Sequence, residues 1–109
     1  MFKVEAITPA IGAEISGFSL NKDLNSDTFE KIYNSLIRHQ VIFFREQNLT
    51  PESHLQLANS FGDIDPGHPV YPHVKGFQSI VLLKNDENNK PDTNDWHKDF
   101  TFKSNPPFA

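Results

Sequence analysis

The sequence predicts an α+β fold within one domain. Two segments with helical spacing of apolar residues alternate with short segments of strand-like composition, and prolines and glycines break much of the second half into loops. The length of 109 residues fits one domain at most, because domains cluster near about 100–150 residues. The chain contains no internal repeat and no low-complexity tract.

Two short strands are expected at the start of the chain. Residues 2–7 alternate between apolar and polar types, which is typical of a half-buried strand, and Pro9 breaks the pattern. Residues 11–15 form a second candidate strand, which ends before Gly17. Both segments are short enough to need partner strands.

The first helix is expected to begin at Asp27, which has capping-box spacing to Glu30, or at Ser26 as a rival N-cap. One apolar stripe follows at helical spacing, formed by Phe29, Ile32, Tyr33, Leu36 and Ile37. Arg38 and His39 fall in the last turn, where positive charge interacts favourably with the helix dipole.

A buried strand and a second helix are expected next. Residues 41–44 are β-branched and then aromatic, as in a buried strand. Thr50 is a suitable N-cap, Pro51 suits the first helical position, and Glu52 places an acid in the first turn. Gly62 suits the position just after the helix. The apolar face of this helix consists of Leu55, Ala58 and Phe61.

The second half is expected to contain loops and two strands. Residues 63–76 hold three prolines and two glycines, which predicts a structured loop. Residues 79–83 resemble a buried strand, and residues 85–95 a polar loop. Residues 96–102 are expected to form one more strand, which the prolines at 106–107 stop.

Composition excludes several classes of function. The chain has no cysteine, so disulfide frameworks, thiolate zinc sites and cysteine nucleophiles are excluded. Ten basic residues against fourteen acidic ones give a formal charge of −4 without a basic stripe, which argues against nucleic-acid binding. No apolar run approaches the roughly 20 residues of a membrane span, and no signal peptide is readable at the start. We therefore expect a cytoplasmic protein.

A histidine and an aspartate near the carboxyl end are the first candidates for chemistry. In an extended strand, His97 and Asp99 share one face, about 6–7 Å apart at the backbone. A histidine, a carboxylate and a second histidine form the facial triad of non-haem Fe(II) oxygenases. His-X-Asp alone is a weak motif, so a structural pair and a metal site both stay open.

The sequence HPVYPH at residues 68–73 is the second candidate. Its prolines stiffen a loop that carries His68, Tyr71 and a further histidine, which suits recognition of a small polar ligand. The alternative is a surface turn whose tyrosine packs against the protein. Asp63 and Asp65 are close enough for paired-carboxylate hydrolysis, although nothing singles them out. No phosphate-binding glycine loop and no nucleophile elbow occurs.

Several motifs follow one another along nearly the whole chain: IGAEISG at 11–17, RHQVIFFREQ at 38–47, LTP at 49–51, FG at 61–62, DWHKDFTF at 95–102 and PP at 106–107. Together they resemble the taurine dioxygenase (TauD/TfdA) family of Fe(II)- and 2-oxoglutarate-dependent oxygenases. The resemblance implies that residues 1–109 are the N-terminal part of a single double-stranded β-helix (jelly-roll) domain, with two flanking helices and an incomplete barrel.

The resemblance also implies roles for single residues. His97 and Asp99 match the first two iron ligands. His68 and Tyr71, within the HPVYPH stretch, match the substrate-contacting pair of members that act on taurine, which favours a sulfonate substrate.

Three further residues are implied as substrate contacts. The backbone at Phe100 would lie beside the anionic end of the substrate. The members that act on taurine carry an asparagine four positions before the iron histidine. Here Thr93 holds that position and Asn94 follows it, so either residue would take this role and taurine is not assured.

The implied activity is hydroxylation of a small sulfonate, with taurine the first expectation, at the expense of 2-oxoglutarate and O₂, releasing sulfite and an aldehyde. The second iron histidine and the arginine for 2-oxoglutarate are expected after residue 109, so the chain alone is expected to be inactive and poorly stable. Two alternatives stay open: the same enzyme class with another sulfonate or a carboxylate substrate, and a non-catalytic module that binds a small ligand or metal. Homo-oligomerisation of the full-length protein also stays open.

Overall fold

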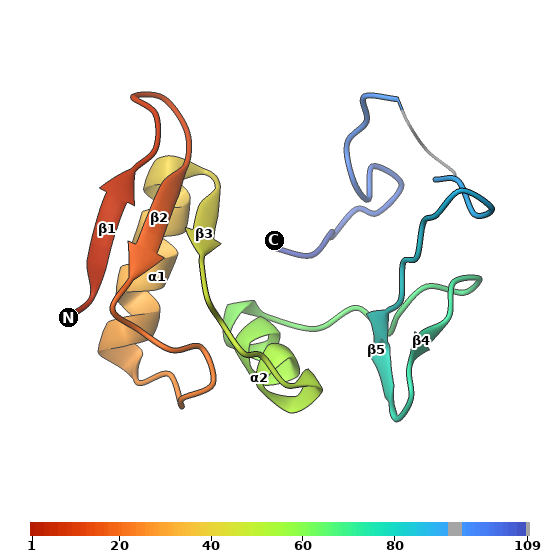
Figure 1. Ribbon diagram of the computed structural model, residues 1–109, viewed down its shortest axis with the longest axis horizontal. Coiled ribbons are helices and arrows are strands. Elements are labelled where there is room, and N and C mark those ends of the chain that lie inside the picture. The colour runs from red at the N-terminus through yellow and green to blue at the C-terminus, as the bar shows by residue number, and fades with distance from the viewer. Residues whose placement is uncertain (92–94, 109) are drawn as a thin grey trace. The chain divides into compact units, whose positions relative to one another are not determined.

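The computed structural model describes residues 1–91 and 95–108 (Figure 1). The chain divides into two compact units, one from Met1 to Leu57 and the other from Ala58 onwards. Each unit is described by itself. None of the helices among the described residues has the length and apolar content needed to cross a membrane.

The first unit contains a three-stranded sheet in the order β1-β2-β3. Strand β1 (Lys3–Ala6) runs antiparallel to β2 (Ala13–Ser16), and β2 runs parallel to β3 (Ile42–Phe44). A parallel pair needs a long connection, and α1 (Ser26–His39) lies within it (Figure 1). The three strands predicted for this region are therefore confirmed, although β1 is an exposed edge strand and β3 is only partly buried.

The first helix begins one residue before the predicted N-cap candidates. Asn25 is the N-cap, and its side-chain oxygen accepts a hydrogen bond from the backbone N–H of Thr28 at 2.8 Å. Asn is among the strongest N-cap residues because its short side chain reaches this N–H. Asp27 instead forms an ion pair with Lys31 along the helix, at 2.6 Å. The expected capping role of Asp27 or Ser26 is therefore wrong.

Among the described residues, four apolar side chains form the buried core, and they lie in the first unit: Ala13, Ile15, Leu20 and Ile32. They come from β2, the following loop and α1, so the sheet and the helix bury one common core. Among the described residues of the second unit, no apolar side chain is buried to this degree.

The second helix, α2 (Pro51–Phe61), begins as predicted. Thr50 and Ser53 exchange hydrogen bonds, since each side-chain oxygen accepts from the other residue's backbone N–H, at 2.9 and 3.2 Å. This is the reciprocal arrangement of a capping box, with serine at the third helical position. The buried Ser53 hydroxyl also donates to the side-chain oxygen of Asn21 at 2.7 Å, which fixes the start of the helix to the first unit.

The second unit contains an antiparallel hairpin, formed by β4 (His73–Val74) and β5 (Phe77–Val81). The turn between them contains Gly76 at φ 83°, a left-handed conformation that glycine adopts without strain. The strand predicted at 79–83 thus exists but begins and ends two residues earlier, because the turn sets its pairing. The predicted loop at 63–76 contains β4 in addition.

The strand predicted at residues 96–102 is not formed. Phe100 has φ 53°, and the backbone N–H of Lys103 donates to the carbonyl of Phe100 at 3.0 Å, so the segment turns. An extended segment needs a neighbour for its backbone hydrogen bonds, and none of the described strands pairs with this one. Two of its aromatic side chains stay in solvent, since Trp96 is fully exposed and Phe102 is 81% exposed. The α+β class is confirmed, while the described residues form no closed barrel.

Candidate metal and substrate site

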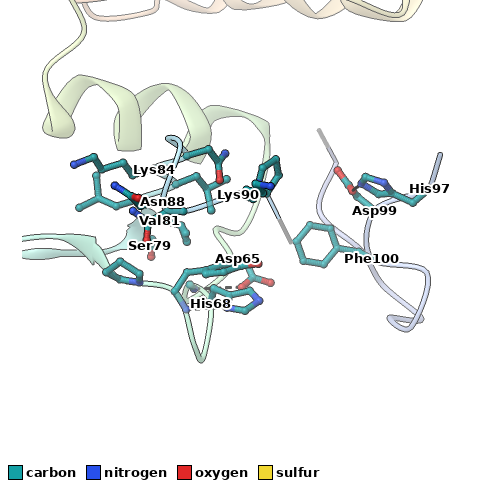
Figure 2. A pocket seen from close by; sticks show the side chains of 18 residues that line it. Asp65, His68, Ser79, Val81, Lys84, Asn88, Lys90, His97, Asp99 and Phe100 are labelled. Carbon is teal, nitrogen blue, oxygen red and sulfur yellow. Dashed lines mark hydrogen bonds and ion pairs between the residues drawn. The ribbon is translucent and has the colours of Figure 1, made fainter. Parts of the chain in front are cut away.

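A cavity of about 1200 Å³ lies within the second unit (Figure 2). It is lined by every predicted site residue that the structure describes, namely His68, Tyr71, His97, Asp99 and Phe100. Thr93 and Asn94 lie outside the described residues. The segment after α2 and the segment at 97–100, which are far apart in sequence, therefore contribute to one cavity.

His97 and Asp99 point toward one another at one end of the cavity (Figure 2). The Nε2 atom of His97 lies 3.2 Å from Oδ1 of Asp99. The side chains are 58% and 80% exposed, so both reacting atoms are open to solvent. The two groups lie close together, but the predicted strand is absent and a turn brings them together.

The hydrogen bonds of His97 leave Nε2 available as a metal ligand. Its Nδ1 lies 2.8 Å from the backbone carbonyl of Asp95, an acceptor, so Nδ1 carries the proton in the neutral ring. Nε2 lies 3.2 Å from the Asp99 carboxylate, a contact that is an ion pair when the ring carries a second proton and that leaves Nε2 free for a metal when it does not. A histidine that ligates a metal typically donates its other N–H to such a carbonyl.

The pair fits two neighbouring positions of an octahedral metal site. With metal–ligand bonds of about 2.1 Å at right angles, two neighbouring ligand atoms lie about 3 Å apart, close to the observed 3.2 Å. Among the described residues, no group of three or more His, Asp or Glu side chains could hold a metal ion. The 3.2 Å separation is thus compatible with two neighbouring metal ligands and equally with a structural histidine–aspartate pair.

His68 and Tyr71 line another part of the cavity, which we call the His68 wall or substrate wall. Their rings stack with centroids 4.2 Å apart, and Nδ1 of His68 accepts hydrogen bonds from the backbone N–H groups of Val70 and Tyr71, both at 3.1 Å. With Nδ1 acting as an acceptor, the proton of the neutral ring sits on Nε2. His68 thus offers an N–H donor from a ring that is fixed at its other nitrogen.

The polar loop at 85–95 contributes residues that the sequence did not single out. Asn88 and Lys90 of this loop, and Lys84 just before it, line the cavity. Asp86 organises this loop, because its Oδ1 accepts from the backbone N–H groups of Asn88 and Asn89 at 2.9 and 2.8 Å. Hydrogen bonds from Asn89, and then from Asn88, lower the pKa of the Asp86 carboxyl.

Asp65 also lines the cavity, and the family resemblance implies no role for it. It forms an ion pair with Lys103, and its Oδ1 accepts from the backbone N–H of Gly67 at 3.2 Å. These contacts, with Lys103 the larger cause, lower the pKa of the Asp65 carboxyl below its usual 3.8. No sequence signal links Asp65 to a residue 38 positions away.

Substitution of Gly67 by alanine is expected to destabilise this wall. Gly67 has φ 112°, and a Cβ atom there would lie 2.4 Å from the backbone oxygen of Gln78. We expect a loss of about 1–3 kcal/mol in the free energy of unfolding of the complete protein, measured in urea. Gly76→Ala is the matched control, since φ is also positive there but no atom lies within 4 Å. Equal losses for the two variants would contradict the contact with Gln78.

Known proteins resemble this chain in sequence. The sequence model of the family described as "Taurine catabolism dioxygenase TauD, TfdA family" matches residues 3–109. An alpha-ketoglutarate-dependent sulfate ester dioxygenase from Pseudomonas putida is 38% identical over 91% of this chain and 32% of its own length. An alkylsulfatase from Acinetobacter baylyi is 36% identical over 92% of this chain and 31% of its own length.

Solved structures resemble the fold of this chain. The crystal structure of a taurine dioxygenase from Burkholderia xenovorans superposes with a TM-score of 0.70 at 36% identity, over 76% of this chain and 31% of that one. The chain spans about a third of the length of the relatives it matches. Because the family match covers nearly the whole chain, the chain belongs to the TauD/TfdA family of dioxygenases.

Proposed function

We propose that the complete protein is an Fe(II)- and 2-oxoglutarate-dependent dioxygenase that hydroxylates a small organic sulfonate or sulfate ester. The observation that carries the proposal is the convergence of His97 Nε2 and Asp99 Oδ1 at 3.2 Å in a chain of the TauD/TfdA family. The pair forms one end of a cavity lined elsewhere by an N–H donor and two lysines.

In the proposed site, His97 and Asp99 hold the iron, and a second histidine and an arginine for 2-oxoglutarate come from outside this chain. The bound iron supplies the activation of O₂, coupled to oxidative decarboxylation of 2-oxoglutarate to succinate and CO₂. The residues of this chain themselves would bind and orient the iron and the substrate. The hydrogen bond from His97 Nδ1 to Asp95 keeps the ring oriented for that purpose.

The anionic end of the substrate is assigned to the wall formed by His68 and Tyr71. The Nε2–H of His68 would donate to a sulfonate or sulfate oxygen, and the backbone at Phe100 would approach the same end. Lys84 and Lys90, which line the same cavity, add positive potential. Thr93 and Asn94 keep the role of neighbouring substrate contacts as an untested proposal.

The products differ between the two substrate classes. Hydroxylation of the carbon next to sulfur makes a sulfonate collapse to an aldehyde and sulfite. Hydroxylation of the carbon that bears the ester oxygen makes a sulfate ester collapse to an aldehyde and sulfate. Taurine is the sulfonate that the HPVYPH loop favours, whereas the names of the two sequence relatives favour sulfate esters.

The test is succinate formation by the complete protein, supplied with Fe(II), 2-oxoglutarate and O₂. Taurine, a short alkyl sulfate and a carboxylate of the same length are compared. We expect taurine to yield sulfite and succinate in equal amounts, or the alkyl sulfate to yield sulfate and succinate in equal amounts. If no substrate raises succinate above the background without substrate, the proposed activity is wrong and the binding-module alternative gains support.

Replacement of His68 by alanine should weaken substrate binding. Loss of a charge-assisted hydrogen bond is expected to raise the KM for the sulfur substrate about 10–100-fold, with a smaller effect on kcat. His73→Ala is the matched control, because His73 belongs to the same loop but does not line the cavity. Similar KM values for the two variants would remove His68 from the substrate site.

A cytoplasmic location and homo-oligomerisation of the complete protein remain predictions from the sequence. The expectation that the protein has no nucleic-acid or membrane partner is likewise a prediction from the sequence. Each is independent of the proposed chemistry.

A further inference from the structure

An ion pair joins the two walls of the cavity. The ammonium group of Lys103 contacts Oδ2 of Asp65, 38 residues away in sequence. The two side chains are 35% and 26% exposed, less than most charged groups of this unit. Among the described residues of the second unit, this is the ion pair that connects segments distant in sequence, since the other links His97 to Asp99.

Both partners are also held locally. Asp65 accepts the backbone N–H of Gly67 at 3.2 Å, which orients its carboxylate. The ammonium group of Lys103 lies 5.2 Å from the ring centroid of Phe100, within the range of a cation–π contact. The backbone N–H of Lys103 closes the turn at Phe100. The pair therefore joins two fixed loops, one on each side of the cavity.

Both partners of the ion pair lie close in sequence to residues of the proposed site. Asp65 lies three residues before His68, and Lys103 lies four residues after Asp99. Asp65 and Phe100 both line the cavity (Figure 2). The separation between the substrate wall and the metal-ligand end therefore depends on this contact.

The charge of Asp65 matters as well. A carboxylate that lines a cavity repels an anionic ligand bound there, and the repulsion grows as water is excluded. Lys103 cancels this charge at close range, while Lys84 and Lys90 keep the cavity net positive. An unpaired Asp65 would thus act against the anion binding assigned to His68.

We propose that Asp65 and Lys103 are positioning residues, which fix the distance between the His68 wall and the His97–Asp99 end and neutralise Asp65 so that an anionic substrate can bind. The catalytic part of this inference rests on the proposed function. Neither residue touches the iron or the reacting carbon in this assignment.

The kinetic test uses K103M, D65N and the double variant D65N/K103M of the complete protein, with taurine and a short alkyl sulfate as probes. We expect K103M to raise KM about tenfold, because it leaves the Asp65 charge unpaired, and to lower kcat, because the link between the two ends of the cavity is lost. D65N should raise KM less, since it leaves a cation. The double variant should bring KM back to within about threefold, because no charge is left unpaired, while its kcat stays low because the link is still absent.

Controls separate this role from general stabilisation. K103R should retain the KM of the unmodified protein, because it restores the charge. K98M removes an exposed lysine of the same segment that does not line the cavity, and its KM should be unchanged. The inference is overturned if K103M has the same KM as K98M, or if the double variant is no better than K103M.

A second readout does not depend on turnover. D65N should accelerate hydrogen–deuterium exchange in residues 97–103 of the complete protein, because that segment loses its link to the opposite wall. Unchanged exchange there would overturn the inference even if K103M does not fold. If the unmodified protein turns over no substrate, the proposed function fails, and the exchange experiment still decides the positioning role.

Discussion

Replacement of His97 by alanine in the complete protein is expected to lower Fe(II) affinity at least about 100-fold and to abolish substrate-dependent succinate formation. The loss should exceed the roughly 10–100-fold effect of residues that only orient metal ligands, since His97 Nε2 and Asp99 Oδ1 are the ligand atoms that this chain brings together. Asp99→Ala should have the same effect. Anaerobic titration with Fe(II), or with Co(II) as a spectroscopic probe, measures the affinity.

The double variant H97A/D99A distinguishes a shared metal from two separate roles. If both side chains hold one ion, either single change removes most of the affinity, and the double change should add little. His73→Ala is the matched control, an exposed imidazole of the same unit that does not line the cavity. Equal Fe(II) affinities for H97A and H73A would contradict the metal assignment and favour a non-catalytic binding module.

The elements of the first unit were largely predictable because local signals specify them. The apolar stripe of α1 and the Thr50–Pro51 start of α2 act through neighbouring residues, so the sequence alone contains the relevant contacts. The error at the first N-cap is of the same local kind, because Asn25, Ser26 and Asp27 are all suitable N-cap residues at adjacent positions, and the side chain of Asn25 is the one that accepts from the backbone N–H of Thr28.

The proximity of His97 and Asp99 was expected from a strand that the structure does not contain, and their role as metal ligands stays a prediction. Strand alternation places residues two apart on one face, and the segment was expected to be such a strand. The structure contains a turn at Phe100 instead, yet His97 and Asp99 still converge. Two residues separated by one position stay close in either backbone, so their proximity was more predictable than the secondary structure around them.

The walls of the cavity were less predictable because they depend on contacts distant in sequence. Asp65 drew attention only as a neighbour of Asp63, and its pairing with Lys103 follows from how two loops meet. Lys84 and Lys90 were assigned to a solvated polar stretch, and only the folded second unit shows that they line the cavity. The motif resemblance implied His97 and Asp99 as ligands because the family pattern contains them, and it contained no information on these neighbours.

Produced on its own, the 109-residue chain is expected to form no succinate above background with Fe(II), 2-oxoglutarate and either taurine or an alkyl sulfate. The described residues supply two converging metal ligands, and a facial triad needs three. Comparison with the complete protein at equal concentration gives the measurement. Turnover by the isolated chain would show that a ligand set exists outside the assigned pair.

The two units of the isolated 109-residue chain should also differ in stability. The buried apolar side chains, such as Ile15 and Ile32, all lie in the first unit, whereas the second unit leaves Leu83, Trp96 and Phe102 largely in solvent. Local opening costs little free energy where few apolar contacts are buried, so hydrogen exchange in the isolated chain should be slow in α1 and β2 and nearly unprotected across residues 97–103. The complete protein should protect both regions, because the metal site requires His97 and Asp99 to be held together. Equal protection of residues 97–103 in the two proteins would mean that the site is self-supporting, and that its two ligands need no packing beyond what these residues provide.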